Sequence, residues 1–256
     1  MAEVVIVRDA DEVGVVAADL IEKLVRRKPD AVLGLATGST PLTTWKSLAT
    51  RGLDLSSVRG FALDEYVGLE PGHPQSYRAV IDREVVEPLG LTPRLVHVPG
   101  DSGPIETAGD DYEMAIEAAG GVDLQVLGIG RTGHLGFNEP SSSFASLTRI
   151  KSLAEQTRID NARFFDSIED VPTHCITQGL GTILRARHLV LLAMGAAKAH
   201  TVAGAVEGPV TASLPASVIQ LHPRVTVIVD EDAATELAHA DYYRNAWNHR
   251  LDWEDR

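Results

Sequence analysis

The chain has 256 residues, with 23 basic against 36 acidic side chains and a formal net charge of −13. This length suits one large α/β domain or two small ones, and it buries enough apolar surface to fold without disulfides or a structural metal. The acidic balance disfavours nucleic acid and anionic membranes as main partners, because both attract a basic face. A small anionic substrate stays open, because a few placed donors set the local field.

The predicted compartment is the cytoplasm. The single cysteine, Cys175, cannot form a disulfide within the chain. The first twelve residues, MAEVVIVRDADE, carry acids where a secretory signal has basic residues. No apolar run approaches the roughly 20 residues that a membrane-spanning helix needs. We therefore expect a soluble cytoplasmic protein.

Short, continuous apolar runs alternate with longer amphipathic stretches along the chain. The runs are typical of buried strands and lie at residues 4–7, 31–35, 58–63, 95–98, 124–127, 188–193 and 225–229. The stretches between them have the three- to four-residue apolar spacing of helices, at residues 11–27, after Pro41, at 77–86, at 112–119, and after the last two strands.

This alternation predicts an α/β fold, with a doubly wound, mostly parallel sheet that has helices on both faces, as in Rossmann-like proteins. We expect a single domain over residues 1–256. The segment 141–180 fits the alternation poorly and is predicted to be an insertion or a lid. Ligands in such folds bind beyond the carboxyl ends of the strands, so polar residues that directly follow a strand are the candidates for chemistry.

The first such motif is Leu35-Ala36-Thr37-Gly38-Ser39-Thr40-Pro41, between a strand and a helix. Gly38 permits a tight turn, and Pro41 suits the first helical position. Free backbone N–H groups, hydroxyls and the helix dipole make an anion site here. Ser and Thr are also ordinary helix caps, and that reading stays open.

The second motif is Asp64-Glu65-Tyr66, directly after the predicted strand 58–63. Two carboxylates at the tip of a strand are candidate general bases. Alternatively, one carboxylate caps the following turn and the other is solvated.

The third motif is Gly128-Ile129-Gly130-Arg131-Thr132-Gly133-His134-Leu135-Gly136-Phe137-Asn138-Glu139-Pro140. A buried strand runs into a glycine-rich loop that delivers a histidine and, five residues later, a glutamate. His134 can transfer protons near neutral pH, and Glu139 can fix its tautomer. A dinucleotide-binding reading fails, because no helix with a ribose-binding acid follows the glycines. No HExxH, paired cysteines or Asp-rich loop indicates a metal site.

Two cations complete the candidate set. Lys198 follows the strand 188–193 at a strand-to-helix junction, where a lysine can bind phosphate, although a single lysine is more often solvated. Arg163 lies in the irregular segment 141–180.

Taken together, LATGSTP, LDEYVGL, GIGRTGHLGFNEP, TRIDNARFF and MGAAKA resemble the glucosamine-6-phosphate deaminase/isomerase family in order and spacing, from about Leu33 to Val229. The DEYVGL and GFNEP pieces are specific. The related 6-phosphogluconolactonases share the fold and a glycine-rich Gly-His loop but lack the FNEP continuation.

The resemblance implies roles by position. Asp64 matches the base that moves a proton between C2 and C1 of the open-chain sugar, His134 the residue that opens the ring, and Glu139 its supporting carboxylate. The loop Thr37–Thr40, Arg163 and Lys198 match positions that hold the 6-phosphate. The family reaction releases fructose 6-phosphate and ammonia and needs no cofactor. Members range from monomers to hexamers, so a homo-oligomer stays open.

One departure from the family pattern concerns Thr132, which stands where the family usually has an aspartate of the ring-opening group. Threonine carries no charge to stabilise an imidazolium, so our hypothesis is that Glu139 alone orients His134. The rival hypothesis is an altered substrate or slower ring opening. In addition, Ser142, Arg149 and Lys151 match positions that bind the activator N-acetylglucosamine 6-phosphate in hexameric members, which implies a regulatory site.

The sequence leaves four candidate functions for the protein. The leading one is isomerisation and deamination of glucosamine 6-phosphate. The alternatives are a lactonase of the 6-phosphogluconolactonase type, a deaminase for another amino-sugar phosphate such as galactosamine 6-phosphate, and a non-catalytic sugar-phosphate sensor in which Thr132 marks lost catalysis.

Overall fold

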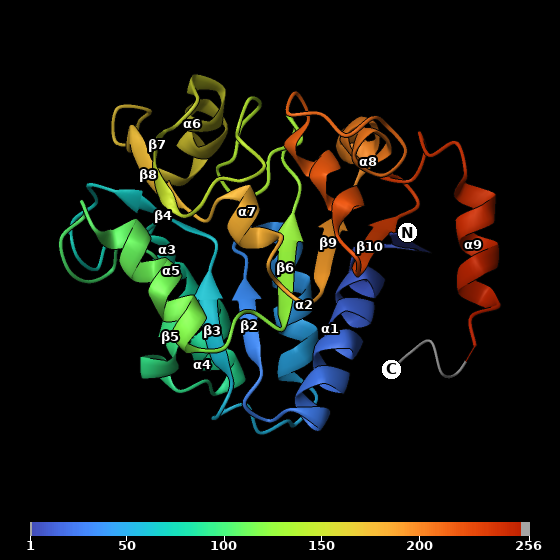
Figure 1. Ribbon diagram of the computed structural model, residues 1–256, viewed down its shortest axis with the longest axis horizontal. Coiled ribbons are helices and arrows are strands. Elements are labelled where there is room, and N and C mark those ends of the chain that lie inside the picture. Colours follow the sequence, from blue (N-terminus) through green and yellow to red (C-terminus); the bar gives the residue numbers. More distant parts are fainter. Residues whose placement is uncertain (1, 252–256) are drawn as a thin grey trace.

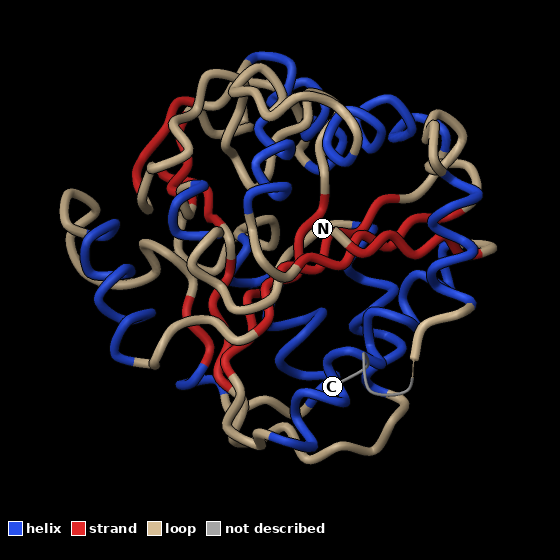
Figure 2. Tube along the Cα trace, turned by 45° about the vertical axis from the view of Figure 1, so that its right-hand side comes forward, coloured by secondary structure: helices blue, strands red, loops and turns tan. Residues whose placement is uncertain are grey.

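The computed structural model describes residues 2–251 of the chain (Figure 1). Its centre is a sheet of seven parallel strands, in the spatial order β1-β10-β9-β6-β2-β3-β5. The strands are β1 (Glu3–Val7), β2 (Val32–Leu35), β3 (Arg59–Ala62), β5 (Val96–His97), β6 (Leu124–Gly128), β9 (Leu189–Ala193) and β10 (Val225–Asp230). Helices lie on both sides of this twisted sheet (Figure 2).

The α-helices connect these strands or follow the last one. They are α1 (Ala10–Arg27), α2 (Ser39–Ala49), α3 (Tyr77–Ile81), α4 (Glu87–Leu89), α5 (Ala108–Ala118), α6 (Glu155–Asn161), α7 (Leu180–Ile183), α8 (Ala199–Val206) and α9 (Ala240–Asn248). A π-helical turn over Asp82–Val86 joins α3 to α4, so the stretch expected as one helix at 77–86 is helical but not a uniform α-helix.

The order of the strands places a topological switch point between β2 and β6. From β2 the chain moves outward through β3 to β5, and from β6 it moves outward in the other direction through β9 to β10. The loops that leave β2 and β6 therefore diverge at the carboxyl edge of the sheet. Crevices of this kind are where open α/β sheets bind ligands.

A second, three-stranded antiparallel sheet was not predicted. It consists of β4 (Asp64–Val67), β8 (His174–Thr177) and β7 (Arg149–Ser152), in that order. Asp64 therefore begins a new strand, whereas the sequence predicted it only at the tip of the strand 58–63. Together with α6, β7 and β8 account for much of the segment 141–180, and they lie beyond the carboxyl ends of the central strands at the top of Figure 1.

The main core lies around the central sheet. β2, β9 and β10 are buried at every position, which explains why they read as continuous apolar runs. The predicted α/β class, the parallel sheet and the approximate bounds of its strands are confirmed. Within residues 2–251, no helix combines the length and apolarity required to cross a bilayer.

Candidate active site

The polar motifs meet at the carboxyl edge of the central sheet. The loop Thr37–Thr40 follows β2, the loop of His134 follows β6, and Lys198 lies beyond β9. These three strands are neighbours in the order β9-β6-β2. The Lys198 Nζ donates to the carbonyl of Ile129 at 2.7 Å, which ties two of these loops together.

Asp64 carries a buried carboxylate. Its side chain is only 8% exposed, and among residues 2–251 no side chain or backbone N–H donates a hydrogen bond to it. Burial, with a further contribution from the charge of Glu65, raises the pKa of Asp64 to about 8. A base with a raised pKa at the carboxyl edge of the sheet is suited to removing a proton bound to carbon near neutral pH.

The neighbouring Glu65 has a structural role. Its carboxylate accepts backbone N–H groups from Tyr66 at 2.7 Å, Tyr77 at 2.8 Å and Arg78 at 2.8 Å. It therefore caps the start of α3. Of the two carboxylates, Glu65 fixes the backbone and Asp64 is the one left for chemistry. The other part of the structural interpretation, a solvated Asp64, is wrong.

His134 lies beside Glu139, with 3.0 Å between Nδ1 and Oε1, and the two form an ion pair when the ring is protonated. Glu139 also accepts hydrogen bonds from the hydroxyls of Thr132 at 2.7 Å and Thr157 at 2.6 Å. Burial acts to raise the pKa of Glu139, but its hydrogen bond and charge interaction with His134, together with the two hydroxyls, lower it to about 2. Glu139 is therefore ionised at neutral pH.

Thr132 bridges the two members of this pair. Its Oγ1 lies 3.0 Å from His134 Nδ1. Because its single hydroxyl proton goes to Glu139, Thr132 accepts at the ring, and both neighbours of Nδ1 are then acceptors. The proton of a neutral His134 therefore resides on Nδ1, which leaves Nε2 to accept a proton from a ligand. The hypothesis that Glu139 alone orients the histidine is incomplete, because Thr132 shares in this.

Two glycines allow the candidate catalytic groups His134 and Asp64 to lie close to one loop. The His134 ring packs against Gly130, where an added Cβ would lie 2.1 Å from Nε2. At Gly136 an added Cβ would lie 3.2 Å from Asp64 Oδ2 and 2.9 Å from Thr177 Oγ1. The loop thus passes directly over Asp64, two residues after it delivers His134. Both approaches require the absence of a side chain.

The loop Thr37–Thr40 has the geometry of an anion site. Gly38, at a φ of 101°, is the N-cap of the eleven-residue helix α2, and no side chain caps this helix. Its first N–H groups therefore remain available to a ligand. The interpretation of the motif as an ordinary Ser/Thr cap is wrong.

Cations surround Lys198. Burial lowers the pKa of Lys198, and the nearby charges of Arg131 and Arg163 lower it further, partly opposed by Asp160. Arg163 is exposed and lies over the Phe164 ring at 4.6 Å. Arg131 lies 4.0 Å from Asp160. The sequence did not single out Arg131 or Thr157 as candidate site residues. Arg131 could have been suggested by its position in the glycine-rich motif.

Two of the three residues of the expected regulatory site, Arg149 and Lys151, lie in β7, and Ser142 lies in the loop that follows Glu139, to whose carbonyl its backbone N–H donates at 3.1 Å. Arg149 and Lys151 are two residues apart in β7, so their side chains project from the same face of the small sheet. In the pairing with β8 their partners are Thr177 and Cys175. Ser142 is 3% exposed, and its Oγ has no hydrogen-bond partner among the described residues. Within residues 2–251, no three His, Cys, Asp or Glu side chains are grouped so that they could hold a metal ion.

The family "glucosamine-6-phosphate isomerases/6-phosphogluconolactonase" matches residues 9–228. The chain belongs to this family. The glucosamine-6-phosphate deaminase of Arthrobacter sp. (strain FB24) is 61% identical, covering 98% of this chain and 99% of the relative. That of Bifidobacterium longum (strain DJO10A) is 58% identical, covering 99% of both.

Solved structures of the family agree with the fold. A monomeric glucosamine-6-phosphate deaminase superposes with a TM-score of 0.88 at 38% identity, covering 92% of this chain and 100% of that one. The 6-phosphogluconolactonase of Thermotoga maritima gives a TM-score of 0.71 at 21% identity, covering 90% and 99%, and this likeness concerns the fold alone. The family resemblance inferred from the sequence motifs is confirmed.

The raised pKa of the buried Asp64 predicts that the free energy of unfolding of the protein depends on pH. A carboxyl group with a raised pKa binds its proton more tightly in the folded state. As pH rises from about 4, the unfolded chain loses this proton first, so the contribution of Asp64 to stability falls until the pH passes about 8. Asp64→Asn removes this loss.

We therefore expect the difference in free energy of unfolding between Asp64→Asn and wild type to change in favour of the variant by up to about 1.4 kcal/mol per pH unit between pH 4 and pH 8. Above pH 8 this difference should become constant. Urea unfolding at several pH values measures it, with the exposed Asp30→Asn as the control. A constant difference between Asp64→Asn and wild type would contradict the prediction.

Proposed function

We propose that the protein is a glucosamine-6-phosphate deaminase, which converts glucosamine 6-phosphate and water into fructose 6-phosphate and ammonia. The observation that supports this most directly is that the glycine-rich loop delivers the oriented His134 and, two residues later, passes over the buried carboxylate of Asp64. We place this reaction in the cytoplasm.

Ring opening is assigned to His134. The pyranose opens when a proton leaves the C1 hydroxyl and another reaches the ring oxygen. With its Nδ1 proton held by Glu139 and Thr132, the ring can take the first proton on Nε2 and return it to the ring oxygen. The ionised Glu139 stabilises the imidazolium that forms between the two transfers.

Isomerisation is assigned to Asp64. The carboxylate removes the proton from C2, the electrons of the C–H bond form a C1–C2 double bond, and the C1 carbonyl oxygen takes up a proton to become a hydroxyl. The proton held by Asp64 then returns to C1, the nitrogen lone pair forms a C2–N double bond, and the nitrogen gives up a proton, which leaves an imine at C2. Water adds to this imine and the C2–N bond breaks, so that ammonia leaves and fructose 6-phosphate remains. No step needs an oxidant or a reductant.

The 6-phosphate is assigned to the N-terminus of α2, Lys198 and Arg163. The open N–H groups of α2 and the cations near Lys198 are suited to a dianion. Binding energy from a non-reacting phosphate can position C1 and C2 beside Asp64. Arg131 adds a further positive charge to this region.

The alternatives have weaker support. A lactonase would use His134 to activate water, but the lactonase structures that match have about 20% identity, against 58% and 61% for the named deaminases. A sensor would not need Asp64 and His134 to be brought together. Galactosamine 6-phosphate differs only in the configuration at one hydroxyl, and no residue discussed above discriminates against it.

The decisive assay measures ammonia and fructose 6-phosphate from glucosamine 6-phosphate, with galactosamine 6-phosphate and 6-phosphogluconolactone run in parallel. We expect both products in equal amounts, a kcat/KM that rises with pH as Asp64 ionises towards pH 8, and a kcat about 10²- to 10⁴-fold lower in Asp64→Asn. Retained binding of fructose 6-phosphate by Asp64→Asn serves as the control. Turnover of the lactone alone would favour the lactonase, and binding without any turnover would favour the sensor.

Thr132 gives a second test. In Thr132→Asp a carboxylate replaces the hydroxyl beside Nδ1 and favours the imidazolium, so we expect the limb of the pH–rate profile that reports ring deprotonation to move up by about one pH unit. Thr132→Asn adds no charge at the same position and should leave that limb in place. Identical profiles for all three proteins would exclude this position from ring opening.

We also propose that the segment 141–180 closes over the sugar phosphate, and that Ser142, Arg149 and Lys151 bind N-acetylglucosamine 6-phosphate as an activator. The segment already contacts the site, because Thr157 of α6 donates to Glu139 and Asn161 donates to Tyr66. Closure would exclude water from the reactive double-bonded intermediate.

For closure, we expect fructose 6-phosphate to slow hydrogen exchange of backbone amides in α6. For activation, we expect sigmoidal initial rates that become hyperbolic with the activator, and loss of this effect in Arg149→Ala. Unchanged exchange would reject the lid, and hyperbolic rates that do not respond to the activator would reject the regulatory site.

A further inference from the structure

Asp230 carries a buried carboxylate at the carboxyl edge of the central sheet, and it has no part in the steps assigned above. It is the last residue of β10 and is 8% exposed. The pairing of β10 with β9 ends with Val229 opposite Ala193, so Asp230 is the first residue of β10 beyond the end of β9. Its side chain is therefore placed beside the turn that leads from β9 to Lys198.

The carboxylate of Asp230 fixes this turn. Both of its oxygens accept the backbone N–H of Gly195, at 3.0 Å from Oδ1 and 2.9 Å from Oδ2. Oδ1 also accepts the backbone N–H of Ala233 at 2.8 Å, which anchors the carboxylate in the turn that follows β10. Glycine has the widest choice of backbone conformations, and Gly195 has a φ of 83°, so its hydrogen bond to a buried acceptor restricts a turn that is otherwise free to move.

The restricted turn leads directly to Lys198. The backbone N–H of Lys198 donates to the carbonyl of Gly195 at 3.0 Å, and its own carbonyl accepts the hydroxyl of Thr201 at 3.0 Å. At the far end of the side chain, Nζ donates to the carbonyl of Ile129 at 2.7 Å. An ammonium group has three N–H donors and this bond uses one of them, so the others can bind a ligand. Their direction depends on where the turn places the lysine backbone.

We propose that Asp230 is a positioning residue for substrate binding, which acts through the N–H of Gly195 to hold the turn that directs Lys198 towards the 6-phosphate. The inference rests on the proposed function, which assigns Lys198 to that phosphate. An ionised carboxylate has only acceptors and repels a phosphate, so Asp230 is not suited to contact the ligand itself. A displaced ammonium group would bind the phosphate less tightly even though the lysine is still present.

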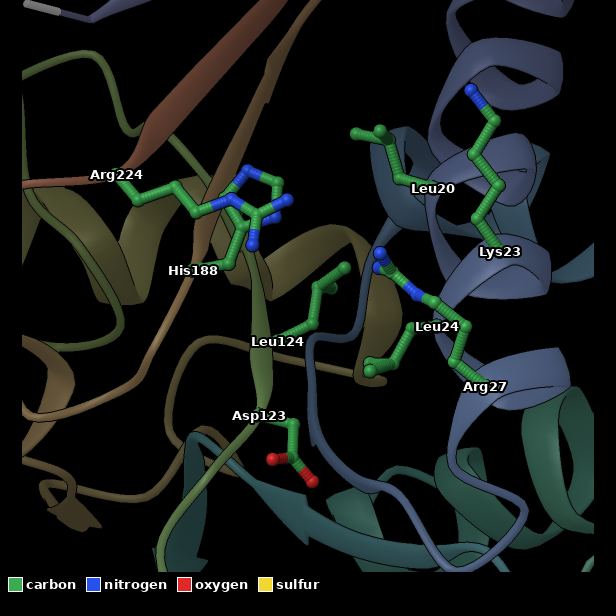
Figure 3. Close-up of a pocket in the computed structure, with 8 residues that line it drawn as sticks. All are labelled: Leu20, Lys23, Leu24, Arg27, Asp123, Leu124, His188 and Arg224. Atoms are coloured by element: carbon green, nitrogen blue, oxygen red, sulfur yellow. The ribbon is translucent and has the colours of Figure 1, made fainter. Parts of the chain in front are cut away.

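Asp123 provides a matched control at the opposite end of the sheet. It is also buried, with 7% exposed, and its carboxylate accepts the backbone N–H of Val32 at 2.8 Å. It directly precedes β6 and lines a pocket between β6 and α1 (Figure 3). Asp123→Ala therefore removes a comparable buried carboxylate and leaves the turn before Lys198 unaltered.

The test is a double-mutant cycle on the binding of fructose 6-phosphate, measured by isothermal titration calorimetry with the full-length protein. We expect Asp230→Ala to raise the Kd about tenfold in wild type but less than about twofold in Lys198→Ala, where the turn no longer directs an ammonium group. Asp230→Asn keeps an oxygen that can accept from Gly195, so it should raise the Kd by less than about threefold. Asp123→Ala should leave the Kd unchanged.

Two results of the cycle would overturn the proposal alone. One is an equal effect of Asp230→Ala with and without Lys198, which would mean that the two residues act independently. The other is an effect of Asp230→Asn as large as that of Asp230→Ala, which would point to charge rather than to the bond with Gly195. A Kd that does not change in Lys198→Ala would instead remove the phosphate assignment of Lys198, and the role of Asp230 with it.

Hydrogen exchange of the unaltered protein gives a second measurement, which does not require any variant to fold. The Gly195 amide should exchange at least about tenfold more slowly than the amides of the exposed Ala196 and Ala197, because its hydrogen bond is to a buried carboxylate. Similar exchange rates at the three positions would show that Asp230 does not hold the turn, and would also overturn the proposal.

Discussion

The burial of Asp64 is the constraint on which the site depends. Ionising a carboxyl group in this position is costly, because burial disfavours the charged form, and the raised pKa of Asp64 reflects that cost. The fold maintains this burial because Asp64 belongs to β4, which is held by pairing with β8, and because Glu65 beside it is fixed by three backbone N–H groups, one from Tyr66 in β4 and two at the start of α3. One acid of the pair holds the backbone, so that the other can be kept away from water and from donors.

The parallel sheet supplies the second requirement, which is convergence. Asp64, His134 and Lys198 are far apart in the sequence, yet each follows a strand of one sheet and so reaches the same edge. The switch point between β2 and β6 separates the two loops that carry the candidate anion site, Thr37–Thr40, and the candidate proton-transfer group, His134. Glycines complete the arrangement, because a side chain at Gly130 or Gly136 would occupy the space of the His134 ring or approach the Asp64 carboxylate too closely.

The sequence predicted those elements whose pattern lies within a few consecutive residues, and it did not predict those that depend on contacts between distant residues. The central strands were readable because both of their faces are buried, which leaves long apolar runs such as Leu189–Ala193. The small sheet was not, because β4 begins with two acids and β7 has half-exposed and exposed residues in alternation. Its pairing also joins residues about 110 positions apart, Asp64 and Thr177, and no local pattern encodes such a contact.

The same limit applies to the site. The motifs singled out Asp64, His134 and Glu139, but the contacts of Thr132 and Thr157 with Glu139 depend on side-chain placement. Thr132 illustrates why residue type alone was insufficient. Judged by charge, it is a loss relative to an aspartate. Judged by hydrogen bonding, it donates to Glu139 and accepts at the ring, which preserves the orientation of His134 while only one negative charge remains beside it. A ring held this way stays directed by geometry, and Glu139 supplies the one negative charge beside it, so the substitution separates the positioning of the histidine from its charge balance.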